Sequence, residues 1–70
     1  MSALCIRFNG QERQTAALTL VQLLDELGFA RDRRGLAVAL NGQVVPRGAW
    51  STRALAGGDR VEVVSAVQGG

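Results

Sequence analysis

The stretch LCIRFNGQERQT, residues 4–15, decides how the fold begins. Leu4, Ile6 and Phe8 alternate with Cys5 and Arg7, which is the period-two pattern of a strand with one buried face. The dipeptide at 9–10 is Asn-Gly, the strongest short-range signal for a hairpin turn. The polar return segment at 11–15 is typical of a strand at a sheet edge, where polar residues discourage unwanted pairing. The stretch therefore predicts an N-terminal β-hairpin.

A short helix follows this hairpin. Thr19 is a good N-cap, and Gln22 stands three residues later, as in a capping box. The leucines fall at i, i+3, i+4 and i+7 and form one apolar stripe, namely Leu20, Leu23, Leu24 and Leu27. Gly28 supplies a left-handed C-cap position. The pattern predicts a helix over 20–27, which only packing can hold because an isolated helix of two turns does not form.

Three further strands are expected in the second half of the chain. Residues 36–40 alternate, a second Asn-Gly dipeptide follows at 41–42, and a short partner strand at 43–45 ends at Pro46. Residues 60–66 form the last strand. The least regular stretch, 47–55, is expected to hold turns or a very short extra strand around Trp50. Trp50 is expected to close one end of the core.

One helix can cover only one face of a sheet. We therefore expect an α+β fold with a mixed sheet of four to five strands, arranged as a β-grasp with the first and last strands parallel at the centre. The covered face consists of alternate strand residues: Leu4, Ile6, Phe8, Leu36, Val38, Leu40, Val61 and Val63. The domain is expected to span 1–66, followed by a flexible tail at 67–70.

Composition excludes several function classes. The 70 residues allow one domain, and they include one Cys and no His, Lys or Tyr. A disulfide framework and a zinc cluster are excluded, and the usual general base and Schiff-base amine are missing. Cys5 has no base to activate it, so we interpret it as a small, half-exposed apolar residue. The chain is therefore not expected to be an autonomous enzyme or to hold a metal.

The charge balance argues against nucleic acid as a partner. The net charge is only +2 although the sequence pI is about 10.0, and a strong electrostatic binder carries more. Arg31, Arg33 and Arg34 are interpreted as a solvated loop, with contact to phosphate or to an acidic partner as the alternative. No apolar run reaches the length of a membrane span and no signal peptide is visible. The default expectation is a reducing, cytoplasmic location.

The C-terminus ends in Gly69-Gly70. A frayed terminus is one interpretation. The functional alternative is activation of the terminal carboxylate as an acyl-adenylate, for which glycine is suited because it has no Cβ and lets the backbone approach closely. Residues 65–70, extended, reach roughly 20 Å. In this hypothesis Gly70 is the modified residue, while Val67, Gln68 and Gly69 thread into a partner.

The sheet face away from the helix is the predicted docking surface. Its predicted members are small and apolar, which leaves the sheet flat for close approach: Cys5, Ala37, Ala39, Val64 and Ala66. Arg7 and Glu62 flank them and set the register of a partner.

Several segments together resemble the sulfur carrier proteins of thiamine biosynthesis. They are the hairpin NGQVVPR at 41–47 with Trp50, the segment GDRVEV at 58–63, the terminal Gly-Gly and the helix at 19–27. The resemblance implies a ubiquitin-like β-grasp and adenylation of Gly70 by an ATP-dependent enzyme related to ubiquitin E1. It implies sulfur delivery from a cysteine desulfurase system, conversion to a thiocarboxylate, and use of that sulfur by thiazole synthase. The carrier itself would bind no ATP and catalyse nothing.

Other functions remain open at this point. The small subunit of molybdopterin synthase shares the architecture but usually carries prolines before its terminal Gly-Gly, and residues 66–68 contain none. Carriers for cysteine synthesis and tRNA thiolation are usually longer. A ubiquitin-like interaction module would need the open sheet face but not Gly70, and a small Arg-based RNA binder is a further alternative.

Overall fold

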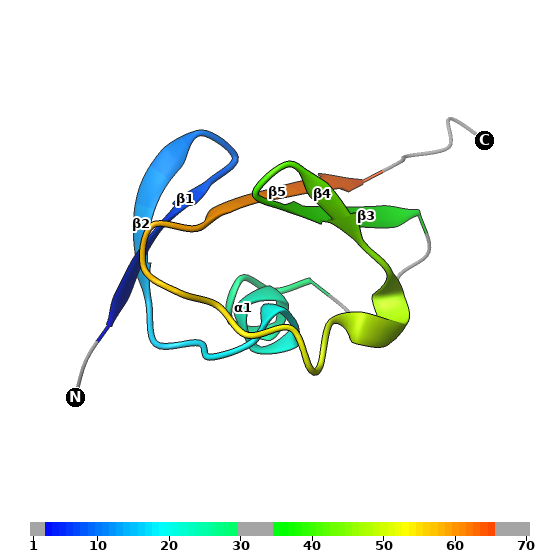
Figure 1. The fold of residues 1–70 in the computed structure, drawn as a ribbon, viewed down its shortest axis with the longest axis horizontal. Coiled ribbons are helices and arrows are strands. Elements are labelled where there is room, and N and C mark those ends of the chain that lie inside the picture. The colour runs from blue at the N-terminus through cyan, green and yellow to red at the C-terminus, as the bar shows by residue number, and fades with distance from the viewer. Residues whose placement is uncertain (1–2, 30–34, 66–70) are drawn as a thin grey trace.

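The computed structural model describes residues 3–29 and 35–65 (Figure 1). In chain order the elements are β1 (Leu4–Phe8), β2 (Gln11–Thr15), α1 (Leu20–Glu26), β3 (Leu36–Leu40), β4 (Gln43–Val45), the 3-10 turn η1 (Arg47–Ala49) and β5 (Arg60–Ser65). The strands and the helix predicted from the sequence are all present. The helix is one residue shorter than expected because Leu27 is its C-cap. Ala66, expected to end the last strand, lies outside the described residues.

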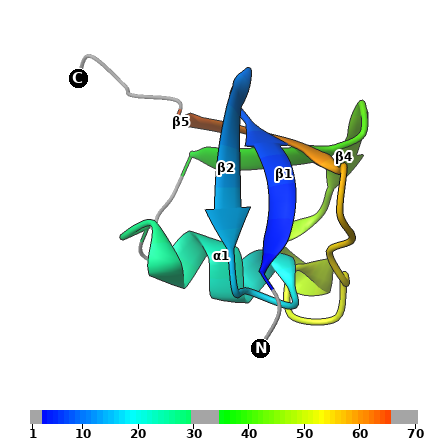
Figure 2. The same ribbon diagram turned by 90° about the vertical axis from the view of Figure 1, so that its left-hand side faces the viewer.

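The five strands form one mixed sheet in the order β2-β1-β5-β3-β4. The first and last strands are parallel, and every other neighbouring pair is antiparallel. The helix lies against one side of this sheet, and the described chain places no helix on the other side (Figure 2). The expected β-grasp, with β1 and β5 adjacent at its centre, is confirmed.

Both Asn-Gly dipeptides form tight hairpin turns. Asn9 and Asn41 have φ of 49° and 53°, and the glycines that follow have φ of 84° and 86°. Two successive left-handed residues define the type I′ turn, whose twist matches that of the flanking strands. The turns fix the register of both hairpins, so that Cys5 faces Gln14 and Ala39 faces Val44.

Side chains and a glycine set the ends of the helix. The Thr19 hydroxyl accepts from the Gln22 N–H at 3.3 Å, and the Gln22 side chain accepts from the Leu18 N–H at 2.8 Å. At the other end Gly28 has φ of 89°, and the Phe29 N–H donates to the Leu24 carbonyl at 2.8 Å. This is a Schellman ending, which uses carbonyls that the helix leaves without partners.

The core fills the space between the helix and the sheet. Its most buried large side chains come from both layers: Ile6, Leu20, Leu23, Leu24, Val38 and Val61. Of the eight sheet residues predicted to face the helix, Leu4 and Phe8 are only partly buried and the rest are buried. Trp50 is 3% exposed and its indole N–H donates to the Val45 carbonyl at 2.9 Å, so the prediction that it closes the core is confirmed.

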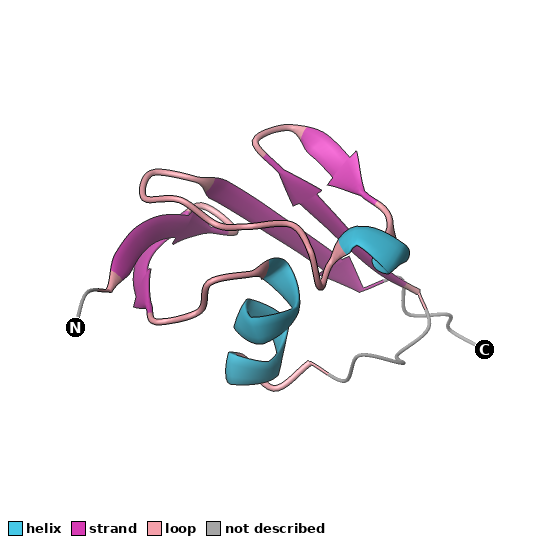
Figure 3. Cartoon of the chain, turned by 60° about the horizontal axis from the view of Figure 1, so that its bottom comes forward, coloured by secondary structure: helices cyan, strands magenta, loops and turns pink. Residues whose placement is uncertain are grey.

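The irregular stretch after β4 is ordered by the helix that it touches (Figure 3). The N–H groups of Leu20 and Val21 donate to the carbonyls of Arg53 and Trp50, each at 3.1 Å. Helix starts leave such donors without intrahelical partners. Of the two alternatives expected here, the structure has the turns: η1 precedes Trp50, no strand forms around Trp50, and the segment that follows completes the hydrogen bonding of α1.

Replacing Leu24 with Ala tests the core. Leu24 is fully buried, so the truncation is expected to cost about 2–5 kcal/mol through lost burial and a cavity. Leu18→Ala is the matched control, because Leu18 is 65% exposed, and its expected cost is near zero. Urea unfolding of the two variants measures both values. A loss under about 1 kcal/mol for Leu24→Ala would contradict the packing described.

Replacing Gly28 with Ala tests the helix ending. A Cβ at Gly28 meets nothing within 4 Å, so the expected loss of about 1–2 kcal/mol comes from its positive φ alone. Gly57→Ala is the control, because Gly57 is equally open but lacks a positive φ. Thermal unfolding should separate the two variants, and equal melting temperatures would show that backbone strain is not what Gly28 relieves.

Candidate functional site

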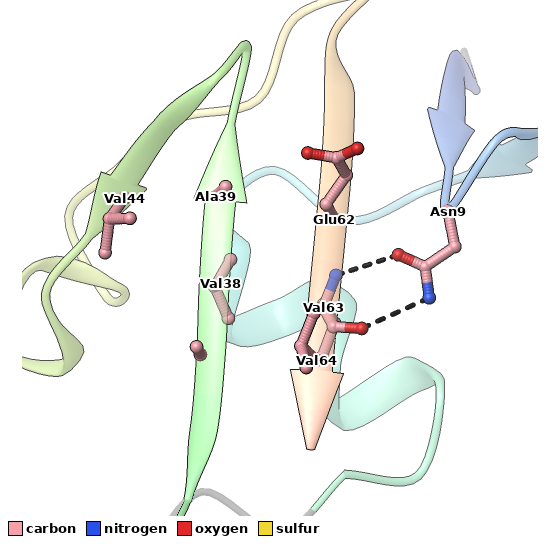
Figure 4. A pocket seen from close by; sticks show the side chains of 8 residues that line it. Asn9, Val38, Ala39, Val44, Glu62, Val63 and Val64 are labelled. Atoms are coloured by element: carbon pink, nitrogen blue, oxygen red, sulfur yellow. Dashed lines mark hydrogen bonds between the residues drawn. The ribbon is translucent and has the colours of Figure 1, made fainter. Parts of the chain in front are cut away.

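The sheet face opposite the helix carries a shallow apolar depression (Figure 4). Strand register places its members side by side, because residues paired across neighbouring strands share a face: Ala37 pairs with Val64, and Ala39 pairs with both Glu62 and Val44. The depression encloses about 530 Å³ and is open to solvent. The structure therefore brings together three of the predicted docking residues, Ala37, Ala39 and Val64.

Two valines make this face apolar despite its exposure. Val44 is 76% exposed and Val64 is 62% exposed. Exposed aliphatic side chains beside alanines form a surface that a partner can cover. Glu62 stands among them as the charged side chain of the lining.

Sequence reasoning missed Val44 and Asn9 as members of this surface. The signal for Val44 was present, since a two-residue turn at 41–42 places position 44 opposite Ala39. The sequence pattern placed Asn9 only in its turn. Asn9 reaches the depression because β1 pairs in parallel with β5, and no local pattern specifies that pairing.

Cys5 lies elsewhere on the same face. It lines a second depression with Arg7, Glu12 and Arg60. The Gly58 N–H donates to the Cys5 carbonyl at 2.8 Å, which places Cys5 beside the start of β5. Val64 lies four residues beyond the first residue of β5, roughly 13 Å at about 3.3 Å per residue. The structure does not bring Cys5 into the apolar depression.

Through its side chain, Asn9 holds β5 at Val63, two residues before the end of the strand. Its side-chain oxygen accepts from the Val63 N–H at 2.8 Å, and its side-chain NH₂ donates to the Val63 carbonyl at 3.3 Å. Figure 4 shows this pair beside the depression. The expected tail residues, Val67, Gln68, Gly69 and Gly70, lie outside the described residues, as do Ala66, Arg31, Arg33 and Arg34.

Within residues 3–29 and 35–65, no cluster of three His, Cys, Asp or Glu side chains could hold a metal ion. Over the same residues, no helix has the length and apolar character needed to cross a membrane.

Known proteins resemble this chain along nearly its whole length. The family model described as the ThiS family matches residues 6–70. The chain is 36% identical over 66 residues to the sulfur carrier protein ThiS of Escherichia coli, covering 93% of this chain and 97% of that protein. It is 40% identical over 63 residues to a thiazole synthase of Paramagnetospirillum magneticum, covering 89% of this chain but only 19% of that protein.

Solved structures agree with the fold described above. The crystal structure of the thiamine biosynthesis protein ThiS from Geobacter metallireducens superposes with a TM-score of 0.79 at 28% identity and covers 96% of this chain and 100% of that one. A solution structure of a thiamine biosynthesis protein from the same organism gives a TM-score of 0.78 at 28% identity, with 96% and 88% covered. Because the family model takes in the strands, the helix and the terminal Gly-Gly, this chain belongs to the ThiS family.

Proposed function

We propose that the carboxylate of Gly70 carries the sulfur that this ThiS-family chain supplies for the thiazole ring of thiamine. The observation that carries the proposal is the family match, which covers residues 6–70 and therefore includes Gly69 and Gly70. The name of the Escherichia coli relative, a sulfur carrier protein of nearly equal length, supports it. Both similar proteins of Geobacter metallireducens are named as thiamine biosynthesis proteins. These names favour the proposed function over that of a molybdopterin synthase subunit.

The chemistry takes place at a carboxylate that is inert until activated. An ATP-dependent enzyme related to ubiquitin E1 transfers AMP to the Gly70 carboxylate and releases pyrophosphate, so that the carboxyl carbon gains a good leaving group. Hydrosulfide then displaces AMP and leaves a thiocarboxylate. A persulfide from a cysteine desulfurase system can attack in the same way and displace AMP to give an acyl disulfide. A thiol must then cleave the sulfur–sulfur bond that came from the persulfide, which releases the thiocarboxylate and leaves a disulfide. The sulfur of a thiocarboxylate is a better nucleophile than the oxygen it replaces.

In this proposal the chain supplies binding and reach, and its partners supply catalysis. The activating enzyme binds ATP, so this chain needs no cofactor of its own. The absence of His and Lys from the sequence fits that division, since no general base or Schiff-base amine is required here. The exposed Cys5 suits a reducing compartment, and we place the reaction in the cytoplasm.

The apolar depression of β3, β4 and β5 is the proposed docking surface for the activating enzyme. Its small side chains allow close approach, and Glu62 offers one charge to fix the register of the partner. Thiazole synthase is the proposed acceptor of the sulfur. The thiazole synthase of Paramagnetospirillum magneticum contains a segment similar to this chain within one polypeptide, which supports a direct encounter between the two activities.

Intact-mass spectrometry tests the role of Gly70. Incubation with the activating enzyme, ATP and sulfide should give the mass gain expected when sulfur replaces one oxygen atom, and the gain should map to the C-terminal peptide. Deleting Gly70, or adding one residue after it, should abolish the gain because the activated carboxylate is displaced. An unchanged mass, while a verified carrier reacts in parallel, would refute the proposal.

Replacing Val64 with Glu tests the docking surface. The buried carboxylate would lack a partner in the complex, so binding to the activating enzyme should weaken at least about tenfold. Leu18→Glu is the matched control, because it places the same charge on a residue of similar exposure, 65% against 62%, next to the helix N-terminus. Calorimetric titration measures both affinities, with circular dichroism to confirm folding. Equal weakening by the two variants would assign docking to another surface.

A further inference from the structure

The side-chain amide of Asn9 takes the place of a strand residue beside β5. Backbone pairing of β1 with β5 ends at Phe8 and Val61. Asn9 then enters its turn, its N–H donating to the Val61 carbonyl at 2.9 Å. Two residues further along β5, the Asn9 amide both accepts from the Val63 N–H and donates to the Val63 carbonyl. The side chain thus continues the parallel ladder for one step after the backbone has turned away.

We propose that Asn9 is a positioning residue: its amide holds the second half of β5 at Val63, and so steadies the strand from which the tail starts when Gly70 is presented to the activating enzyme. The inference rests on the proposed function of Gly70. It goes beyond that function, since it assigns a role in tail presentation to a side chain near the other end of the sequence. The Asn9 side chain bonds to Val63, which precedes Gly70 by seven residues.

Two independent requirements meet at position 9. The type I′ turn needs a residue that tolerates φ near 49°, and Asn tolerates the left-handed region better than most residues. The contact with Val63 needs a donor and an acceptor side by side, which a short carboxamide provides. Glycine would satisfy the first requirement and not the second. Aspartate would keep the acceptor and lose the donor.

Beyond Val61 the two sides of β5 are held differently. On one side β3 pairs with β5 as far as Leu36 and Ser65. On the other side, within the described residues, β1 contributes no backbone pair after Val61, and the Asn9 amide is what bonds to Val63. Without that amide the last residues of β5 would be paired on one side only. More of the chain would then have to be ordered when the tail enters a partner, which weakens productive binding.

Asn41 offers a matched control within the same molecule. It occupies the same place in the second Asn-Gly turn, and its amide also bonds to the segment of β5: the oxygen accepts from the Arg60 N–H at 2.9 Å, and the NH₂ donates to the Asp59 carboxylate at 3.0 Å. These contacts are at the start of β5, ten residues from Gly70. Loss of the Asn41 amide removes comparable hydrogen bonds without touching the end that leads to the tail.

The experiment compares Asn9→Gly with Asn41→Gly in the full chain. Amide hydrogen exchange reports each contact directly. Exchange of the Val63 N–H should rise up to about tenfold in Asn9→Gly, and exchange of the Arg60 N–H should rise similarly in Asn41→Gly. Thiocarboxylate formation with the activating enzyme, ATP and sulfide is followed by intact mass. Asn9→Gly should raise KM for the carrier about fivefold or more with kcat nearly unchanged, and Asn41→Gly should leave KM within about twofold.

Asn9→Asp covers the case in which Asn9→Gly does not fold. It retains the acceptor, so its KM should lie between those of the wild type and Asn9→Gly. Equal KM changes in the Asn9 and Asn41 variants would overturn the positioning role and leave only a stabilising one. Faster exchange at Val63 with an unchanged KM would overturn it as well. If the wild-type chain itself forms no thiocarboxylate, the proposed function fails first and the positioning role falls with it.

Discussion

The pairing of β1 with β5 is the constraint on which the rest of the structure depends. It joins the two ends of the sequence in parallel at the centre of the sheet, through bonds from the Arg7 N–H to the Asp59 carbonyl and from the Asn9 N–H to the Val61 carbonyl, both 2.9 Å. A parallel pair cannot be closed by a tight turn and needs a long crossover connection. Here the connection contains β2, α1, β3, β4 and η1, and the core lies between the helix of that connection and the sheet. Val61, at the pairing, is fully buried.

The two faces of the sheet differ because a helix lies on only one of them. The seven-residue helix α1 covers one face, and residues 3–29 and 35–65 place no second layer on the other. On the covered face the strands carry Leu, Ile and Val, which fill volume. On the open face Ala37 and Ala39 leave a hollow between the exposed valines of β4 and β5. An exposed apolar hollow is typical of an interaction surface, which supports the proposal that a partner covers it.

Local signals predicted most of the fold. The two Asn-Gly turns, the Thr19 cap, the Gly28 ending and the period-two strands each depend on neighbours in sequence, and each is present. The segment after β4 could not be predicted in the same way, because its order comes from helix N–H groups that reach the carbonyls of Trp50 and Arg53. The same distinction applies to the site. Alternation along β3 and β5 placed Ala37, Ala39 and Val64 together, but only the parallel register separates Cys5 from them.

The repeated Asn-Gly motif shows what topology adds to a local signal. Both dipeptides form the same turn with nearly the same dihedral angles, and in both the Asn amide bonds to the β5 segment. Their consequences differ because β1 runs parallel to β5 and β3 runs antiparallel to it. Both turns begin next to Val61, but the Asn9 amide is directed toward the later residues of β5 and the Asn41 amide toward the earlier ones. The Asn41 amide bonds at Asp59 and Arg60, where the chain enters the sheet, whereas the Asn9 amide bonds at Val63, two residues before the end of β5. The motif sets the shape of the turn, and the strand order determines which part of the central strand its side chain holds. In the proposed function the tail that follows β5 carries Gly70, and the Asn9 amide bonds three residues nearer to that tail than the Asn41 contact at Arg60. A residue that suits the turn thereby also holds the second half of the central strand.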